Sequence, residues 1–350
     1  MGTGRTAACR PDGAGPVRMY KPRRPQASPL FRLVQDQFRP LQMVYDERFA
    51  PTYGAWRAVV PEVADKFLAC GVLKHGFARV RCDACAHEYL LPFSCKARYF
   101  CPSCHAKRLA LWTLWLEETL LAAVPHRQVV LTIPKRLRTW CLYRRALLGD
   151  LARVAARTVT AAVRMLTREP DIAVGVVACI QTHGSLANWH PHIHLLVTDG
   201  GLFEADGAQG MLAWPHSGFH VHDGVWVADG DLDFAKRLAR YCARNPVALD
   251  RLQYDGPATS VQYRSDKRDG PTAGTETVDP LEFLARLVTH IPNKHQVMTR
   301  YYGWYANRPR GTRRKAAGAH RILSRGRLNF LAPMTSPLNV QNPPPCSLRA

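Results

Sequence analysis

The chain has 350 residues, 47% of them hydrophobic, and its 48 Lys and Arg exceed its 27 Asp and Glu to give a net charge of +21. This composition excludes wholesale disorder, and the sequence lacks the Gly-X-Y period of collagen and the sustained heptads of a coiled coil. No apolar run reaches the roughly 18 residues of a membrane helix, and the basic N-terminus lacks the apolar stretch of a secretory signal. The length predicts about two domains, and the arginine-rich charge favours nucleic acid as partner.

Hydrophobic periodicity predicts a mixed helical and β-structured chain. The first half should hold helical stretches within 30–70, a helix over 105–123, a strand over 127–134 and an amphipathic helix over 141–168. The second half should hold apolar strands over 171–184 and 190–201, a loop or hairpin insertion over 203–230, a helix over 231–244, strands near 248–254 and 259–265, a loop at 269–274, a helix over 279–291 and a last strand over 297–305. Asp231 and Asp279 are the expected N-caps of the last two helices.

Eleven cysteines are too few and too unevenly spread for a disulfide scaffold, which favours a reducing, intracellular compartment and metal over disulfide. Two CxxC pairs stand fifteen residues apart, Cys82 with Cys85 and Cys101 with Cys104. Each pair can aim two thiolates at one point, and two pairs close a tetrahedral zinc site. The spacing therefore predicts structural zinc on these four residues. Cys95 and His105 lie close enough in sequence to replace one of the ligands.

Three histidines alternate in the segment HPHIHLLV, at positions 190, 192 and 194. Residues two apart on a strand share a face, so the imidazoles should lie together while Ile193 and Leu195 face the core. Such a row can hold one divalent ion. Gln181 and His183 alternate in the same way on the preceding strand, and either could complete the site if the two strands pair.

A metal beside basic residues favours phosphoryl transfer, because the ion can neutralise non-bridging oxygens. The sequence has no P-loop and no acidic cluster suited to a two-metal nuclease. A tyrosine hydroxyl is then an available covalent nucleophile. Tyr241 has arginines around it on the predicted 231–244 helix, but spacing alone does not choose it over four other tyrosines, Tyr254, Tyr263, Tyr301 and Tyr302.

Four segments occur in a distinctive order: FSCKARYFCPSCHAKR, QTHGSLANWHPHIHLLVTDGG, LARYCARNPV and HIPNKHQVMTRYYGWYANRPRG. From about residue 40 to 320 the chain resembles the rolling-circle transposases of the insertion-sequence ninety-one type, which belong to the HUH (His-hydrophobe-His) endonuclease superfamily. The resemblance implies an α+β fold, with a central antiparallel sheet flanked by helices and an N-terminal helical, zinc-ribbon domain. The expected parts are a basic leader (1–28), a helical zinc-binding domain (29–123), a catalytic domain (124–307) and a basic, then Pro-rich tail (308–350).

By this resemblance His192 and His194 form the HUH motif that binds the catalytic divalent ion, Mg²⁺ or Mn²⁺, and Tyr241 is the nucleophile. Some members carry a second tyrosine four residues earlier, where this chain has Arg237, so a single-tyrosine enzyme is expected. Asn245 stands where many members have a proline. The third metal ligand stays open among three residues, Gln181, His183 and His190.

The implied reaction is attack of the tyrosine on single-stranded DNA, giving a 5′-phosphotyrosine and a free 3′-hydroxyl that a later strand transfer consumes. The expected DNA contacts are basic residues near these motifs, Arg237, Arg240, Arg244, Lys107 and Arg108. The expected location is the cytoplasm of a bacterial-type cell, at the nucleoid. The alternatives are a zinc-ribbon DNA-binding protein without catalysis, a replication initiator or relaxase using the same chemistry, and a metal-dependent hydrolase of another fold.

Overall fold

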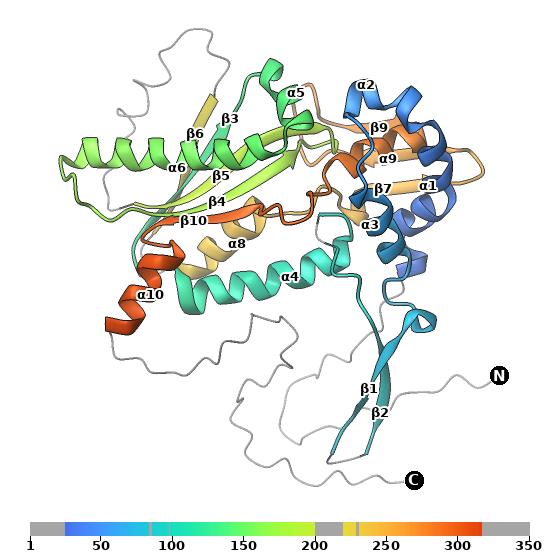
Figure 1. Cartoon of the computed structure of the whole chain (residues 1–350), viewed down its shortest axis with the longest axis horizontal. Coiled ribbons are helices and arrows are strands. Elements are labelled where there is room, and N and C mark those ends of the chain that lie inside the picture. Colours follow the sequence, from blue (N-terminus) through green and yellow to red (C-terminus); the bar gives the residue numbers. More distant parts are fainter. Residues whose placement is uncertain (1–24, 84–85, 98, 200–219, 229–230, 317–350) are drawn as a thin grey trace.

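The computed structural model describes residues 25–83, 86–97, 99–199, 220–228 and 231–316 (Figure 1). Its helices are α1 (Pro29–Arg48), α2 (Ala50–Tyr53), α3 (Val59–Leu68), α4 (Pro102–Trp115), α5 (Lys135–Tyr143), α6 (Ala146–Thr167), α8 (Leu232–Cys242), α9 (Pro280–Thr289) and α10 (Asn307–Ala316), with the short turns η1 (Pro25–Ala27), η2 (Leu73–His75), η3 (Leu116–Leu120) and η4 (Leu249–Arg251). Its strands are β1 (Phe77–Arg81), β2 (Glu88–Pro92), β3 (His126–Thr132), β4 (Gly175–His183), β5 (Trp189–Thr198), β6 (His220–Val227), β7 (Leu252–Asp255), β8 (Ser260–Arg264), β9 (Thr275–Val278) and β10 (Thr299–Gly303). Most of the expected leader, most of the expected 203–230 insertion and the tail beyond residue 316 lie outside the described residues.

The centre of the molecule is a five-stranded sheet with the order β10-β4-β5-β3-β6, in which every neighbouring pair is antiparallel. Helix α6 covers one face, and α8 and α4 cover the other (Figure 1). The expected α+β fold with a central antiparallel sheet is therefore confirmed.

The two faces of the sheet divide the residues of β4 and β5 by parity. Ile180, Ile193 and Leu195 pack under α6, whereas Val177 and Leu196 pack under α8. The even-numbered histidines of β5 and the odd-numbered Gln181 of β4 consequently share the α8 face, but the pairing shifts register between Gln181 and His183, so parity does not place His183. The prediction that Ile193 and Leu195 face the core opposite the imidazoles is correct.

Local chemistry explains two of the helix starts. The side chain of Asp231 accepts from the amide of Phe234 (2.9 Å), and that of Asp279 accepts from the amide of Glu282 (3.0 Å). Several stretches differ from expectation. Two helices, α5 and α6, replace the single helix 141–168; the strands of two regions, the β1–β2 hairpin and β9, were not expected; and α10 occupies the start of the expected tail.

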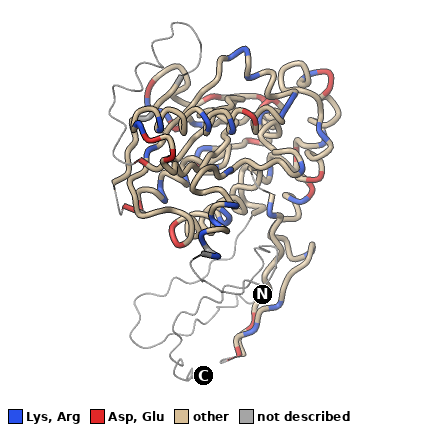
Figure 2. Tube along the Cα trace, turned by 60° about the vertical axis from the view of Figure 1, so that its left-hand side comes forward, with Lys and Arg blue, Asp and Glu red and all other residues tan. Residues whose placement is uncertain are grey.

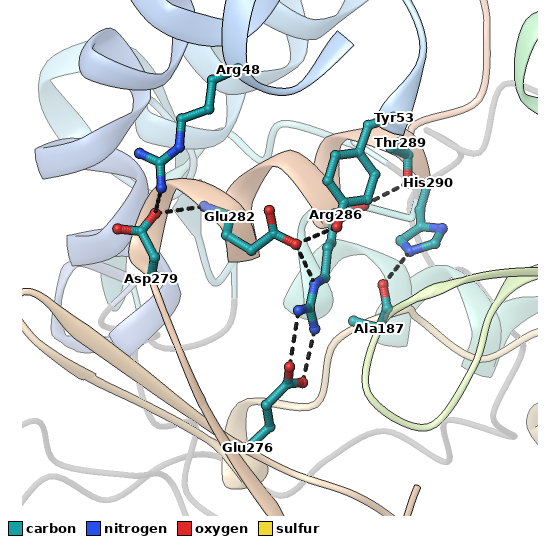
Figure 3. Close-up of polar contacts among 9 residues, drawn as sticks. All are labelled: Arg48, Tyr53, Ala187, Glu276, Asp279, Glu282, Arg286, Thr289 and His290. Carbon is teal, nitrogen blue, oxygen red and sulfur yellow. Dashed lines mark hydrogen bonds and ion pairs between the residues drawn. The ribbon is translucent and has the colours of Figure 1, made fainter. Parts of the chain in front are cut away.

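The N-terminal helices share their apolar core with a segment more than 200 residues later in the chain. Leu30, Leu41 and Phe67 belong to the same buried cluster as Phe283 and Leu287 of α9. Polar contacts frame this interface in Figure 3: Arg48 pairs with Asp279 (3.5 Å), and the Tyr53 hydroxyl donates to Glu282. Helix α9 thus joins the N-terminal unit to the rest of the molecule.

Basic residues occur on most elements of the described chain, interspersed with fewer acidic ones (Figure 2). The net charge therefore does not by itself mark a single DNA-binding face. Within the described residues, no helix combines the length and the apolar character required to cross a bilayer.

Candidate active site and zinc-binding cluster

The histidine strand β5 pairs with β4 in a register that places Gln181 directly opposite His192 and Cys179 opposite His194. Directly opposed residues of an antiparallel pair project to the same face. His194 is 3% exposed and Gln181 2% exposed, whereas His192 is half-buried. The two strands therefore pair, as the completed histidine site required, and their pairing brings candidate nitrogen and oxygen ligand atoms together under α8.

Tyr241, on the last turn of α8, lies against this group. Its ring meets the His194 ring edge-on, with the centroids 5.6 Å apart and the planes at 90°. The Arg244 guanidinium carbon lies 4.8 Å from the Tyr241 ring centroid, and Arg244 also pairs with Asp266. Because Tyr241 is 48% exposed, its ring combines contact with a buried histidine and access from solvent.

Side chains hold the three successive backbone carbonyls at the end of α8. The Gln181 amide nitrogen donates to the carbonyls of Tyr241 and Cys242, at 2.8 Å each. His105 lies with its Nε2 2.7 Å from the carbonyl of Ala243, while its Nδ1 accepts from the amide of Tyr99 (3.3 Å). The last carbonyls of a helix lack partners within it, so these two side chains fix where α8 ends and where Tyr241 stands.

Three buried side-chain atoms of β4 and β5 have no hydrogen-bond partner: Gln181 Oε1, His183 Nε2 and His194 Nε2. Leaving such atoms unsatisfied costs free energy, and all three are donor atoms that a divalent metal accepts as ligands. Burial lowers the pKa of His192 to about 4 and holds the pKa values of His183 and His194 well below their ordinary value. A neutral imidazole keeps a free lone pair on one nitrogen. The histidine nitrogens and the Gln181 oxygen are therefore atoms that could bind a metal ion.

Neighbouring groups orient the two motif histidines. Nδ1 of His192 lies 2.7 Å from the carbonyl of His190, which accepts its proton and leaves Nε2 free. The Gln128 amide nitrogen lies 2.9 Å from His194 Nδ1. Rotating that amide by half a turn would present its carbonyl to an Nδ1–H and free Nε2 as a ligand.

Four cysteines from the part of the chain that precedes β3 form a compact cluster. The sulfurs of Cys70, Cys95, Cys101 and Cys104 all lie within 4.8 Å of one another, and Cys104 is 3.5 Å from both Cys70 and Cys95. Four thiolates bound tetrahedrally at about 2.3 Å would be about 3.8 Å apart, so the cluster fits zinc. Backbone amides support it, since Cys95 N donates to Cys70 and Ala97 N to Cys95, each at 3.4 Å.

This cluster corrects the predicted zinc ligands. Cys101 and Cys104 belong to it, but Cys82 does not: it is exposed at the end of β1, in a hairpin that projects from the body (Figure 1). Cys85 lies outside the described residues. The other two thiols come from Cys70, which directly follows the α3 region, and from Cys95, the residue already named as a substitute. His105 is not among the four and contacts Ala243 instead.

The predicted DNA contacts are spread over α8 and α4. On α8, Arg244 lies over Tyr241, Arg240 donates to Thr113 Oγ1 of α4 (3.3 Å), and exposed Arg237 lies near Phe234. On α4, Lys107 is exposed and Arg108 is half-buried. Of these five, Arg244 is the one whose guanidinium group lies over the ring of Tyr241.

Two contributors were not singled out from the sequence. Cys70 has no CxxC partner and stands 25 residues before Cys95, so no local spacing marks it. Gln128 lies on the apolar strand β3. It shares a face of that strand with Val130, which is paired with His194, so the period of two was the signal that could have placed it beside the histidines.

Known proteins match both the region of the cysteine cluster and the region of the histidine strand and α8. A family described as "Transposase zinc-binding domain" matches residues 41–133, and one described as "Putative transposase" matches 175–211 and 208–313. The "Transposase for insertion sequence element IS801" of Pseudomonas savastanoi pv. phaseolicola is 27% identical over 303 residues, covering 73% of this chain and 72% of that protein. The "Putative transposase y4qJ" of Sinorhizobium fredii is 27% identical over 288 residues, covering 65% and 70%. No solved structure gives a significant match.

Proposed function

We propose that the chain is a transposase of the insertion-sequence ninety-one type with an N-terminal zinc-binding domain, and that it cleaves and rejoins single-stranded DNA through a covalent bond to Tyr241. The observation that carries this proposal is the contact between the exposed Tyr241 ring and buried His194, beside donor atoms that lack partners. Mobilisation of the element by a rolling-circle route would follow from this chemistry.

The proposed ligands of the catalytic ion, Mg²⁺ or Mn²⁺, are His192, His194 and Gln181. Gln181 faces His192 across the strand pair, and its nitrogen is already used by α8, so its oxygen is the atom left to bind. His183 competes with it, because its Nε2 is also buried without a partner. His190 is less suited, since its Nδ1 lies 3.3 Å from His192 Nδ1.

When bound, the ion would polarise the scissile phosphate and offset its negative charge. The Tyr241 hydroxyl loses its proton and attacks the phosphorus; the bond to the 3′-oxygen breaks, leaving a 5′-phosphotyrosine and a 3′-hydroxyl. A second strand's 3′-hydroxyl then attacks the same phosphorus and releases Tyr241, so the number of phosphodiester bonds is conserved. Arg244, beside the ring, is placed to stabilise the charge that develops near the phenol oxygen.

A single tyrosine suffices for this scheme. The position four residues before Tyr241 is Arg237, which is exposed and lies near Phe234 rather than toward His194. The proposed DNA contacts are the basic residues around this face, Arg237, Arg240, Arg244, Lys107 and Arg108.

The test is a covalent adduct assay with labelled single-stranded DNA that carries candidate element ends, in Mg²⁺ or Mn²⁺. Wild-type protein should give a labelled band that survives denaturation, and both Tyr241→Phe and a His192→Ala, His194→Ala double variant should give none. Tyr301→Phe is the matched control, because that half-buried tyrosine accepts a hydrogen bond from Trp112 and its loss should leave the adduct intact. An adduct that persists in Tyr241→Phe would refute the nucleophile. Tight DNA binding without any adduct would favour a binding protein.

A further inference from the structure

A groove lies beside α6, on the opposite side of the sheet from Tyr241. It has a volume of about 800 Å³ and lies between the C-terminal half of α6 and the end of β10. Its lining includes three arginines, Arg157, Arg164 and Arg168, above a floor of small and aliphatic side chains. Helices α6 and α8 cover opposite faces of the sheet (Figure 1). The groove beside α6 is therefore on the face that Tyr241 does not use.

The three arginines follow one line along α6. They occupy positions i, i+7 and i+11, which return to nearly the same side of a helix with 3.6 residues per turn. Arg157 and Arg164 lie about 10 Å apart along the axis, and Arg168 follows about 6 Å further on. The groove is therefore bordered by a straight row of cations rather than by scattered charge.

These cations have no acidic partner among the described residues, and all three are exposed. Arg153 on the same helix provides the contrast, because it pairs with Asp150 at 2.7 Å. A row of guanidinium groups left without carboxylates suits an external anion with repeated charges, and Arg presents a fork of donors that matches phosphate.

Two further observations concern the groove itself. Arg168 adopts a left-handed backbone conformation (φ 55°, ψ 23°) at the C-cap of α6, a position that glycine or asparagine fills more readily. The chain thus keeps an arginine where the backbone would favour glycine, and that side chain lines the groove. Tyr302, on the opposite wall, has a buried hydroxyl without a partner.

We infer that this groove binds the phosphate backbone of duplex DNA that flanks the single strand cleaved at Tyr241. Backbone contact is favoured because the lining offers guanidinium groups and aliphatic side chains. Single-strand binding surfaces usually add exposed aromatic rings for base stacking, and Tyr302, packed against the α6 side of the sheet, is the single aromatic residue here. Duplex recognition by this groove should be independent of sequence.

The inference rests on the family's DNA substrate but not on the phosphotyrosine chemistry. Fluorescence anisotropy with the full-length protein would compare a 20-base-pair duplex with a 20-nucleotide single strand over a salt series. The triple variant Arg157→Gln, Arg164→Gln, Arg168→Gln should bind the duplex at least tenfold more weakly. The slope of log binding constant against log salt concentration should become shallower by about 2 to 3, since each lost phosphate contact removes about 0.9 from the slope. Arg153→Gln on the same helix is the control and should change neither quantity.

Two outcomes would overturn the inference: unchanged duplex affinity and salt slope in the triple variant, or an equal loss for single-stranded DNA. Arg168→Gly separates binding from folding, because it should raise the melting temperature while lowering duplex affinity; a fall in both would contradict the assignment. The single-strand adduct at Tyr241 is measured in parallel and should be unaffected by the groove variants. A wild-type protein that forms no adduct but shows the predicted duplex effects would refute the proposed function and leave this inference standing.

Discussion

The amide nitrogen of Gln181 donates to the backbone carbonyl of Tyr241 at 2.8 Å, and the same nitrogen reaches the carbonyl of Cys242. This side chain on the sheet, together with His105 on α4, therefore sets the end of the helix that carries the proposed nucleophile. Its oxygen is left buried and unpaired on the side of the histidines. Nucleophile position and metal binding are consequently linked through a single residue.

Substitutions at Gln181 should separate these two roles. Gln181→Glu keeps an oxygen ligand but cannot donate to the α8 carbonyls, so it should retain Mn²⁺ binding while the rate of adduct formation falls. Gln181→Leu should lose both, with metal affinity reduced by roughly 10- to 100-fold. Calorimetric Mn²⁺ titration and adduct kinetics would measure the two effects. If Gln181→Leu binds Mn²⁺ normally and His183→Ala does not, His183 is the ligand.

His105 should act on catalysis although it touches neither the histidines nor the zinc cluster's sulfurs. Replacing it with Phe removes the bond to the Ala243 carbonyl and leaves a buried acceptor unsatisfied, at a cost of about 1–3 kcal/mol. We expect slower adduct formation at saturating DNA with unchanged zinc content, and partial recovery in His105→Gln, which can still donate. Equal rates in His105→Phe and wild type would show that Gln181 alone positions α8.

Zinc content should depend on Cys70 and Cys95 as much as on the pair Cys101 and Cys104. Cys70→Ser and Cys95→Ser should each lose the metal held by the four-thiol cluster and lower the melting temperature, because metal binding contributes directly to folding. Cys82→Ser should leave this site filled. Elemental analysis and the thiolate absorption of the cobalt-substituted protein provide the measurement. Retention of the tetrathiolate spectrum in Cys70→Ser, with its loss in Cys82→Ser, would restore the ligand set predicted from spacing.

Acid should destabilise the protein partly through His290. Its Nε2 donates to the Ala187 carbonyl in the turn between β4 and β5 (Figure 3), and burial lowers its pKa to about 3. The unfolded chain takes up a proton below the ordinary value of about 6.5, while the folded chain stays neutral. This contribution to stability is therefore complete above that pH and is lost progressively from about pH 6.5 down to pH 3.

The corresponding measurement is the free energy of unfolding of metal-free protein between pH 6 and pH 4. His290→Gln removes one of the groups that protonate only on unfolding. The variant's free energy of unfolding should therefore fall less steeply with decreasing pH than that of the wild type, and the two slopes should differ by up to about 1.4 kcal/mol per pH unit. The other buried histidines keep the remaining slope above zero. An unchanged slope would mean that His290 is protonated in the folded protein.

Much of the catalytic face could be predicted from the sequence, because a strand's period of two is a local property. Alternation alone placed His192 and His194 on one face and offered Gln181 from the neighbouring strand, and the observed register brings them together. The end of α8 was predicted to within two residues: the helix expected over 231–244 ends at Cys242, and Pro246 further on cannot continue a helix. What alternation cannot give is the distance from Tyr241 to the histidines, which depends on how α8 packs.

The zinc ligands and the N-terminal packing could not be predicted in the same way. Spacing favoured Cys82, but β1 and β2 carry it away from the cluster, and Cys70 is brought in by the turn that follows α3. The contact of Leu30 with the α9 region joins residues more than 200 positions apart. No periodicity encodes such a pairing, because it arises only when the whole chain is folded.

That long-range core has a consequence for synthesis of the protein on the ribosome. The apolar face of α1 emerges first, but α9, which completes its core, is made only after the histidine strand and the tyrosine helix. Until then α1 has no native partner there, a state that favours chaperone binding or degradation. A prematurely terminated chain that already contains Tyr241 would thus lack a stable N-terminal unit. Release of cleavage-competent fragments by incomplete translation should consequently be rare.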